Sequence, residues 1–318
     1  MKITAGRSFY ELVKSRAHIL VPDLQWALAE SDGLWSESPD ACELLVLAGD
    51  TYTSAFVERV VKIPGLRWAH TEDAGTDGIF YDTMRARGVR VTHSPGANAI
   101  EVAEFAFGLL LWSAKRLGDF QDQQRTHRWQ LLGLEGLSNK IVLIVGLGAI
   151  GSRVATYAKA FGMQVLGIRQ SAERIAEVDD QGTLADLSLF LPLADFVVLA
   201  LPGSAATKNL LGKTEFSMMK STATVINVAR GSVLDLPALR EALDTNQIRQ
   251  ACLDVLPQEP WPADDALWDH PRIFLTPHNA WSSPLYVPRV ADLWLENLRR
   301  YVKGEPLLHL VSPEEKSV

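Results

Sequence analysis

The sequence predicts an α/β fold with two Rossmann-like domains, and three observations support this prediction. The chain has 318 residues, more than one hydrophobic core usually organises. Short apolar runs alternate with helix-forming segments, as they do in parallel sheets with crossover helices. One apolar run, residues 141–145, leads directly into a glycine-rich turn and a helix. Together these patterns predict a parallel sheet in each of two domains.

The first 95 residues contain short apolar runs separated by polar residues, glycine and proline. The predicted strands cover residues 18–21, 44–48, 66–69 and 89–92, and the predicted helices cover 54–63 and 79–87. The loop 71–78 follows one of these strands, at the sheet edge where α/β proteins bind ligands. An ordinary glycine turn is the alternative interpretation of this loop.

A long helix is predicted over residues 100–117, which are rich in apolar and helix-forming types. Asn98 and Glu101 have the spacing of a capping box at its start. A helix this apolar must be buried on most sides, between two domains or between two subunits. The polar segment that follows carries Phe120 and Trp129, which suggests either a partner surface or local packing.

The glycine-rich turn has the form Gly-x-Gly-x-x-Gly, a dinucleotide-binding fingerprint when a strand precedes it and a helix follows. Gly146 would permit the tight turn, Gly148 would let the backbone approach a pyrophosphate, and Gly151 would let the helix pack close to the strand. The start of the helix would offer unpaired N–H groups to the phosphates. The turn residues predicted to bind the cofactor are Gly146, Gly148, Ala149, Ile150 and Gly151. A tight β–α turn without a nucleotide is the alternative.

The residue that would recognise the adenine ribose comes about 20 residues later, after the strand predicted at 164–168. An NAD-binding turn would have an acidic residue there, but this chain has Arg169, and its next carboxylate is Glu173. Because an arginine can pair with the 2′-phosphate of NADP, we predict that NADP is preferred over NAD. The alternative is that Arg169 stacks on the adenine or remains in solvent.

The alternation resumes after this point, and the last helix, predicted at 287–302, is expected to return to the first domain. The predicted strands cover residues 194–202, 224–228, 249–255 and 273–275, and a helix is predicted at 236–243. Arg230, Glu259 and His278 follow the last three of these strands. Since parallel strands end at one sheet edge, the three side chains are expected near the cofactor.

The three residue types make a coherent acid–base set. The guanidinium of Arg230 is suited to a carboxylate and a neighbouring carbonyl oxygen. A carboxylate such as Glu259 beside the imidazole of His278 stabilises the protonated imidazole, which makes it a usable acid near neutral pH. Taken singly, each residue has a structural explanation, as a histidine after a strand, a helix C-cap or a surface charge. Their shared sheet edge favours an active site.

Taken in order, the motifs resemble the D-isomer-specific 2-hydroxyacid dehydrogenase family over nearly the whole chain, and most closely its glyoxylate/hydroxypyruvate reductases. The segments that carry the resemblance, besides the glycine turn, are Asp73-Ala74-Gly75-Thr76-Asp77, Ser94-Pro95-Gly96-Ala97-Asn98, Val102-Ala103-Glu104, Leu201-Pro202, Asn227-Val228-Ala229-Arg230-Gly231, Leu253-Asp254-Val255, Glu259-Pro260 and Thr276-Pro277-His278. Such an ordered set is far more specific than any one motif.

The resemblance implies roles for the matching residues. Arg230 would hold the substrate carboxylate and polarise its C2 carbonyl, His278 would donate the proton in reduction, and Glu259 would raise the basicity of His278. Asp254 would bind the nicotinamide carboxamide. The other residues implied to line the cofactor are Leu201, Pro202, Thr207, Val228 and Ala229. Backbone N–H groups of Ala74, Gly75 and Thr76 would bind the substrate carboxylate from the other domain. Trp281 would cover the substrate or simply pack.

The resemblance also implies discontinuous domains. Residues 1–96 with 285–318 would form a flavodoxin-like substrate domain, and residues 97–284 a doubly wound parallel-sheet dinucleotide-binding domain inserted between them. Family members are usually homodimers joined through the cofactor domain and the arm after the long helix. The implied reaction transfers a hydride from NADPH or NADH to a small 2-oxoacid such as glyoxylate or hydroxypyruvate, giving the D-2-hydroxy acid.

Composition limits the other partners. The net charge is −7 and no basic block appears, which argues against a nucleic-acid surface. No apolar run is long enough to span a bilayer and no secretory core precedes residue 21, so a cytoplasmic location is expected. Cys42 and Cys252 are expected to be small buried hydrophobes, and the seven histidines show no paired metal-ligand spacing.

Two other functions fit the same motifs. A nucleotide-sensing binding protein, like the corepressors that share this fold, would change its oligomeric state with nucleotide and show little turnover. The chain has no long appended tails of the kind that such regulators usually carry. Oxidation of phosphonate or phosphite is a second enzymatic alternative, because a fold does not determine its substrate.

Overall fold

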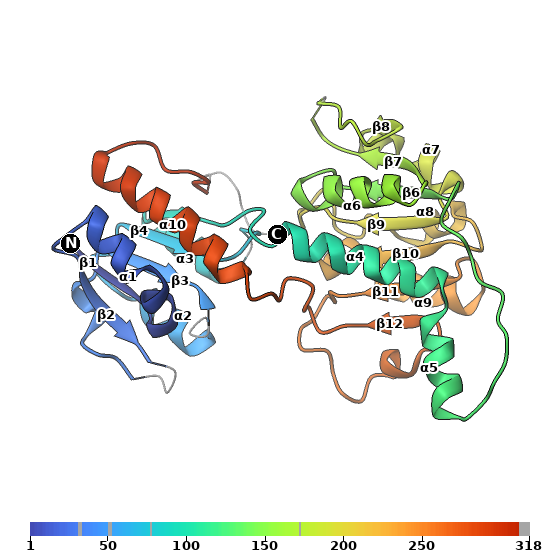
Figure 1. The fold of residues 1–318 in the computed structure, drawn as a ribbon, viewed down its shortest axis with the longest axis horizontal. Coiled ribbons are helices and arrows are strands. Elements are labelled where there is room, and N and C mark those ends of the chain that lie inside the picture. Colours follow the sequence, from blue (N-terminus) through green and yellow to red (C-terminus); the bar gives the residue numbers. More distant parts are fainter. Residues whose placement is uncertain (31–33, 50–52, 77, 172, 312–318) are drawn as a thin grey trace. The chain divides into compact units, whose positions relative to one another are not determined.

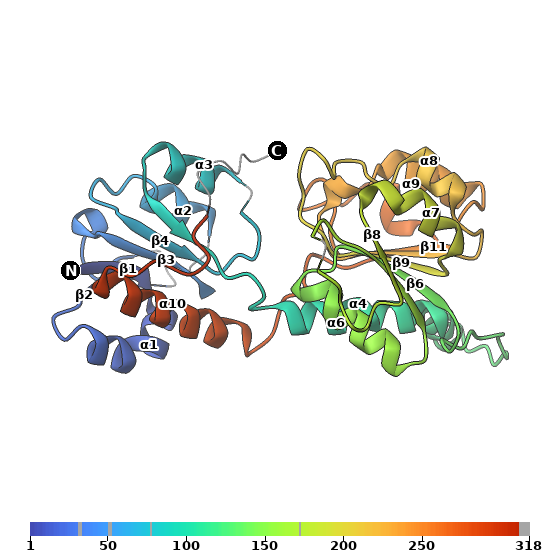
Figure 2. The same ribbon diagram turned by 90° about the horizontal axis from the view of Figure 1, so that it is seen from above.

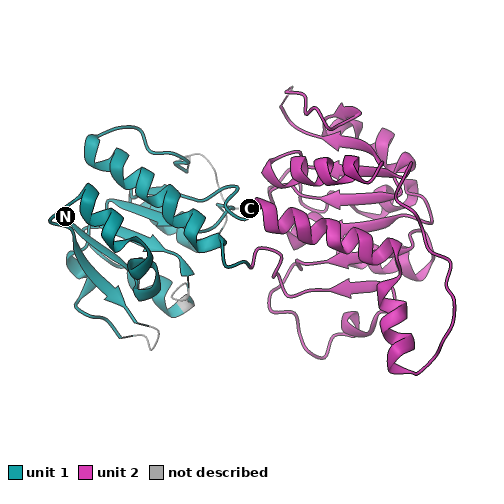
Figure 3. Ribbon diagram, viewed as in Figure 1, with its two compact units in different colours: residues 1–98, 283–318 teal, residues 99–282 magenta. Residues whose placement is uncertain are grey.

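The computed structural model describes residues 1–30, 34–49, 53–76, 78–171 and 173–311 (Figure 1). The chain divides into two compact units, Met1–Asn98 with Ser283–Val318 and Ala99–Ser282 (Figure 3). The boundaries predicted from sequence, after residue 96 and before residue 285, fall close to these. Each unit contains one parallel sheet with helices on its faces, so the predicted α/β class with two Rossmann-like sheets is confirmed.

Unit 1 is built on a five-stranded parallel sheet with the order β2-β1-β3-β4-β5, which is the flavodoxin-like order. The strands are β1 (Lys2–Gly6), β2 (Gln25–Ala29), β3 (Leu44–Leu47), β4 (Trp68–Thr71) and β5 (Arg90–Thr92). The helices are α1 (Arg7–Leu20), α2 (Ser54–Val60), α3 (Ile79–Ala86) and α10 (Tyr286–Lys303). β3 and β4 are buried at every position, as the central strands of a sheet covered on both faces must be.

The last helix belongs to this first unit. α10 lies beside α1 (Figure 2), and the rings of Phe9 and Trp294 meet edge to face with centroids 5.5 Å apart. α10 is strongly amphipathic, and its buried residues recur at helical spacing. Residues from both ends of the chain therefore share one hydrophobic core.

The strand predicted at residues 18–21 is wrong, because this segment is the end of α1. Phe9, Val13 and Ala17 recur every four residues and are fully buried, which is the pattern of a helix that packs along one stripe. Ile19 is 78% exposed, so it does not have the burial expected of a residue in a central strand. The helical period of the whole segment prevails over the local strand preference of its last residues.

Unit 2 is built on a seven-stranded parallel sheet with the order β12-β11-β10-β9-β6-β7-β8. The strands are β6 (Ile141–Val145), β7 (Gln164–Ile168), β8 (Asp180–Gly182), β9 (Phe196–Leu199), β10 (Thr224–Asn227), β11 (Gln250–Leu253) and β12 (Ile273–Leu275). In chain order this is the doubly wound arrangement, and the direction of winding reverses between β6 and β9. Ligands of such sheets bind outside the carboxyl ends of the strands at this reversal.

Helices cover both faces of this second sheet (Figure 2). One face carries α4 (Ala99–Ala114) and α6 (Ala149–Ala160), which pack on each other. The other face carries α7 (Leu187–Phe190), α8 (Lys213–Met218) and α9 (Leu236–Asp244). None of the described helices combines the length and apolar character that a bilayer span requires.

The long helix predicted at residues 100–117 is divided in two. α4 ends at Ala114, and α5 (Leu117–Arg125) begins after Arg116, whose φ of 50° is left-handed and interrupts the helix. The predicted capping box is not formed by the side chain of Asn98, because its Oδ1 atom is buried and accepts no hydrogen bond from the described residues. α4 is buried against the sheet and α6.

Candidate active site

The three predicted catalytic residues follow three neighbouring strands of the unit 2 sheet. Arg230 comes after β10, Glu259 after β11 and His278 after β12, and these strands pair with one another in register. Since the strands are parallel, their carboxyl ends lie at one edge of the sheet. The sheet therefore places the three side chains at the same edge as the glycine turn that follows β6.

Glu259 and His278 form a direct pair, with Oε2 of Glu259 2.6 Å from Nδ1 of His278. An ionised carboxylate can only accept, so Nδ1 carries a proton and Nε2 is the nitrogen that can exchange one with a ligand. The side chain of His278 is 42% exposed and that of Glu259 is 38% exposed. It is therefore accessible as well as hydrogen-bonded.

The charges around this pair favour the protonated imidazole. The hydrogen bond that His278 donates to Glu259 raises the pKa of His278 above its ordinary value. Burial opposes this shift, the charges of Glu259 and Asp254 add to it, and the charge of Arg230 counteracts it. Burial would raise the pKa of the Glu259 carboxyl, but hydrogen bonds from His278 and from Leu256 N–H outweigh it, and the net pKa lies below the usual range. The arrangement is therefore a carboxylate that favours the protonated form of the imidazole.

Asp254 organises the turn that carries His278. Its buried carboxylate accepts hydrogen bonds from Thr276 Oγ1 at 2.6 Å, from Asn279 N at 3.0 Å and from Ala280 N at 3.1 Å. Its backbone oxygen also accepts from the N–H of His278 at 2.8 Å. His278 has a left-handed φ of 50°, which is uncommon for a residue with a side chain. The bonds to Asp254 hold the turn in this conformation and so orient the imidazole.

Arg230 and the Glu259 loop are brought together by a close backbone approach at Gly231. A Cβ built on Gly231 would lie 1.9 Å from the carbonyl carbon of Leu256, so only glycine fits there. Leu256 N–H in turn donates to Oε1 of Glu259 at 2.9 Å. The guanidinium of Arg230 donates to Ala229 O at 2.9 Å through Nη1. Gly231 had no predicted role, and its contact partner is distant in the sequence.

The glycine turn after β6 has the geometry that the fingerprint requires. Gly146 has a φ of 105°, and a Cβ there would lie 2.5 Å from the oxygen of Ala200. A Cβ on Gly151 would lie 2.0 Å from the oxygen of Gly146, whereas one on Gly148 would meet nothing within 4 Å. α6 starts with Ala149 and Ile150, and its first N–H groups have no helical acceptors. The turn therefore fits a pyrophosphate, with open space at Gly148 and N–H donors at the helix start.

The remaining residues predicted to line the cofactor are distributed around the same edge. Arg169 follows β7, and its Nη2 lies 2.7 Å from Oε2 of the exposed Glu173. Leu201, Val228 and Ala229 are nearly buried after β9 and β10, whereas Pro202 is exposed. Thr207 donates to Pro202 O at 2.9 Å and accepts from Ser204 N at 2.8 Å, so its side chain stabilises the loop after β9. Trp281 is 39% exposed and donates from Nε1 to His278 O at 2.8 Å.

The predicted substrate loop, Ala74, Gly75 and Thr76, lies in unit 1 after β4. Asp77, which completes its motif, lies outside the described residues. Three successive carbonyl oxygens accept hydrogen bonds from other segments. These pairs are Glu72 O with Tyr286 OH, Asp73 O with Ser94 N at 2.9 Å, and Ala74 O with His93 Nδ1 at 3.0 Å. Among the described residues, the N–H groups of Ala74 and Gly75 donate to no acceptor. A loop with its carbonyls bound and N–H groups available can bind an anion.

Cys42 and Cys252 are both buried, and burial raises the pKa of their thiols, to about 11 and about 12. They are packing residues rather than nucleophiles. Within the described parts of the chain, no group of three or more histidine, cysteine, aspartate or glutamate side chains has the arrangement of a metal site.

Comparison with known proteins identifies the family. Residues 107–280 match the family model described as D-isomer specific 2-hydroxyacid dehydrogenase, NAD binding domain. A glyoxylate reductase from Korarchaeum cryptofilum is 34% identical over 258 residues, which cover 79% of this chain and 77% of that protein. A glyoxylate/hydroxypyruvate reductase B from Salmonella agona is 32% identical over 275 residues, covering 84% and 83%. A D-3-phosphoglycerate dehydrogenase from Methanocaldococcus jannaschii is 30% identical; this match covers 87% of the chain but 53% of that longer protein.

Solved structures agree with the sequence relatives. A D-isomer specific 2-hydroxyacid dehydrogenase family protein from Aeromonas salmonicida superposes with a TM-score of 0.84 at 28% identity, over 98% of this chain and 99% of that one. A D-isomer specific 2-hydroxyacid dehydrogenase from Xanthobacter autotrophicus, in complex with NADPH and MES, has a TM-score of 0.79 at 28% identity, over 98% of each chain. The chain therefore belongs to the D-isomer-specific 2-hydroxyacid dehydrogenase family.

Proposed function

We propose that this chain is an oxidoreductase that reduces a small 2-oxoacid, such as glyoxylate or hydroxypyruvate, to the D-2-hydroxy acid. The observation that carries the proposal is the 2.6 Å contact between His278 and Glu259 at the edge that also bears Arg230 and the glycine turn. Relatives named glyoxylate reductase and glyoxylate/hydroxypyruvate reductase support the choice of substrate class.

Each catalytic residue has a distinct task in this proposal. A reduced nicotinamide supplies the hydride when it is bound. His278 gives a proton from Nε2 to the oxygen on C2, and Glu259 keeps the imidazole protonated until then. The guanidinium of Arg230 opposes the negative charge that develops on the same oxygen, and its second N–H pair holds the substrate carboxylate. Asp254 keeps the histidine turn in place, and its carboxylate is directed at that turn.

Two further groups take part in substrate recognition in this proposal. The N–H groups of Ala74, Gly75 and Thr76 bind the substrate carboxylate, and Trp281 limits the size of the group on C2. A panel of glyoxylate, hydroxypyruvate, pyruvate and bulkier 2-oxoacids, each assayed with NADH and NADPH, tests the proposal. Chiral analysis of the product should give the D-isomer. Absence of turnover across the whole panel would refute the proposed function.

NADPH is the preferred cofactor in this proposal because Arg169 stands where an acidic residue would bind the ribose of NAD. Its partner Glu173 is 71% exposed, and such a surface ion pair is weak enough for a phosphate to displace. Arg169→Ala is expected to raise KM for NADPH about tenfold or more, and to leave KM for NADH nearly unchanged. Lys213→Ala, which removes an exposed cation elsewhere in unit 2, is the matched control. Equal losses with both cofactors would argue against a 2′-phosphate contact.

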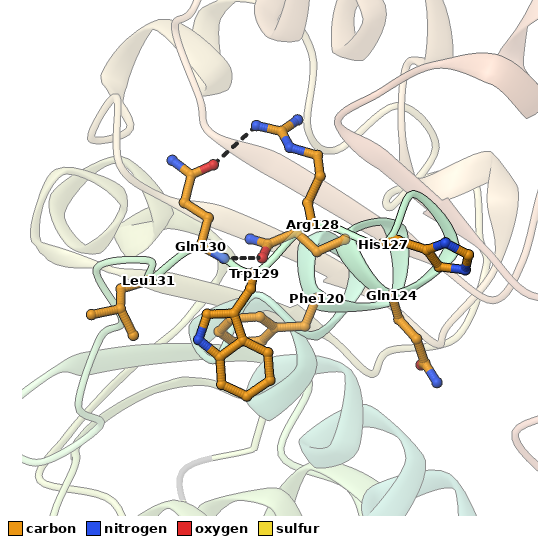
Figure 4. Close-up of a pocket in the computed structure, with 8 residues that line it drawn as sticks. Phe120, Gln124, His127, Arg128, Trp129, Gln130 and Leu131 are labelled. Atoms are coloured by element: carbon orange, nitrogen blue, oxygen red, sulfur yellow. Dashed lines mark hydrogen bonds between the residues drawn. The ribbon is translucent and has the colours of Figure 1, made fainter.

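We also propose a homodimer joined through the segment after α4, which contains Phe120, Trp129 and Leu131. This segment is called the arm. The arm exposes Trp129 at 99% and Leu131 at 93%. These two residues and Phe120 line a cavity of about 490 Å³ whose other lining residues are polar (Figure 4). Exposed aromatic and aliphatic side chains around a hollow are typical of a subunit interface.

Trp129→Glu is expected to shift the dimer toward monomer, weakening self-association by about a hundredfold, because buried tryptophans dominate such interfaces. Analytical ultracentrifugation over a concentration series measures the effect. Leu189→Glu on α7, where the leucine is 65% exposed, makes a comparable change away from the arm and should leave the dimer intact. If both variants dissociate equally, the arm is not the interface.

A further inference from the structure

Glu72 is an acidic side chain at the base of the substrate loop, and the proposed reaction gives it no task. It follows β4 directly and is only 9% exposed. Its Oε2 accepts a hydrogen bond from Gly49 N at 2.7 Å, so it joins the loop after β3 to the loop after β4. A buried carboxyl group that joins two loops at the ligand edge of a sheet is well placed to affect what binds there.

The backbone of Glu72 is fixed as firmly as its side chain. Its N–H donates to Leu47 O at 2.9 Å, and its carbonyl accepts from the hydroxyl of Tyr286 in the first turn of α10. Two residues later, Ala74 presents an N–H group that donates to no described acceptor. The carboxyl group and the anion-binding N–H groups therefore belong to one rigidly held segment.

The environment of Glu72 disfavours its charged form. Burial raises the pKa of its carboxyl group to about 7; the hydrogen bond from Gly49 opposes this shift, and the neighbouring charge of Asp73 adds to it. On α10, burial also raises the pKa of Tyr286, so that this phenol is neutral at pH 7 and adds no charge.

Three other ionisable groups of the surrounding elements have identified hydrogen bonds to neighbouring residues. From α3, Tyr81 donates to Asp73 Oδ2 at 3.0 Å. From the end of β5, His93 lies 3.0 Å from Ala74 O. From α10, Arg289 donates to Ala97 O at 3.1 Å. The charge that adds to the raised pKa of Glu72 is that of another carboxylate, Asp73.

Resting on the proposed function, we propose that Glu72 is a positioning residue that lets the substrate loop bind a carboxylate tightly only while its own carboxyl group is protonated. An ionised Glu72 would repel a substrate carboxylate bound by the N–H groups of the same loop, whereas the neutral acid would not. By linkage, a bound anion must raise the pKa of Glu72 in return, and binding near neutral pH therefore takes up a proton.

The direction of the pH dependence follows from these charges. Glu72 is neutral below its pKa, so substrate affinity is highest on the acid side. Affinity falls as the pH rises through about 7, because the free protein loses the proton that the complex retains. KM should rise up to about tenfold for each pKa unit by which the bound substrate shifts Glu72. His278 also titrates in the proposed reaction and would affect kcat, so KM and kcat must be measured separately.

Glu72→Gln tests this proposal, because the amide imitates the neutral acid and its oxygen can still accept from Gly49. In the native protein, KM for glyoxylate should rise between about pH 6 and pH 8.5, whereas in the variant it should stay constant within about twofold. The decline of kcat with pH should be the same in both. Glu58→Gln, at an exposed position on α2, should retain the native KM profile. If the KM profiles of native protein and Glu72→Gln coincide, the role of Glu72 is refuted.

Binding of oxamate, measured by calorimetry at pH 7 in buffers of different ionisation enthalpy, separates this proposal from the proposed function. Proton uptake by the native protein that is lost in Glu72→Gln supports the role of Glu72, even if no 2-oxoacid is turned over. Equal proton uptake by both proteins overturns it. Absence of turnover with 2-oxoacids, by contrast, refutes only the reaction.

Discussion

His278→Ala is expected to lower kcat for 2-oxoacid reduction between about a hundredfold and ten-thousandfold, because it removes the group that donates the proton in the transition state. The affinity for NADPH should change little, because the groups proposed to bind the cofactor phosphates lie elsewhere. The glycine turn follows β6 and Arg169 follows β7, whereas His278 follows β12. Steady-state kinetics with saturating NADPH measure the first effect, and fluorescence titration of the cofactor measures the second. Near-normal turnover would remove His278 from the chemistry.

Glu259→Gln provides a graded comparison with this variant. The glutamine retains the size of the side chain but not the charge that raises the pKa of His278, so the imidazolium loses its main stabilisation. Reduction requires the protonated imidazole and declines as the pH rises through its pKa. In Glu259→Gln that decline should therefore begin at lower pH, whereas oxidation of the hydroxy acid should extend to lower pH. An unchanged pH profile would mean that the pair does not titrate during catalysis.

Gly231→Ala is expected to lower the free energy of unfolding by about 3 kcal/mol, the upper end for overpacking, because the added methyl group would collide with backbone rather than with a movable side chain. Any relief must separate the Arg230 segment from the loop of Glu259, so kcat should fall as well. Urea unfolding followed by tryptophan fluorescence measures the stability, and the same samples can be assayed for turnover.

Gly108→Ala is the matched control for this substitution. Gly108 lies within α4, and a Cβ there would meet nothing within 4 Å. Alanine should stabilise the helix by roughly 0.5–1 kcal/mol, because it restricts the unfolded chain and favours the helix. If Gly231→Ala were as stable as this control, the close approach to Leu256 would not exist in solution.

The sheet of unit 2, except β8, and the edge that bears the candidate site were predictable from the sequence. β7 and β12 have the predicted bounds, because each is a short apolar run between clear breaks. Parallel strands end at one edge, so residues that follow β10, β11 and β12 had to gather there. What the sequence could not indicate was the contact between Gly231 and Leu256, because it joins two loops through backbone atoms alone.

Unit 1 was less predictable, for physical reasons. The amphipathic helix α1 ends in residues of high strand preference, and its helical stripe prevails because that stripe packs against α10. The elevated pKa of Glu72 depends on burial by segments that meet only in the folded unit. Its single sequence signal is its position before the Ala74-Gly75 turn, a pattern that indicates a ligand loop but no role for Glu72.

The substrate loop has one more consequence for how this protein can diverge. With three consecutive peptide oxygens tied to Tyr286, Ser94 and His93, the peptide planes cannot turn over without breaking bonds to α10 and to the segment after β5. In the proposed function, the preference for a negatively charged head group is thereby built into the main chain. Substitutions of nearby side chains could then change which groups the ligand carries elsewhere. The acid group of the ligand would still be required, because main-chain atoms bind it.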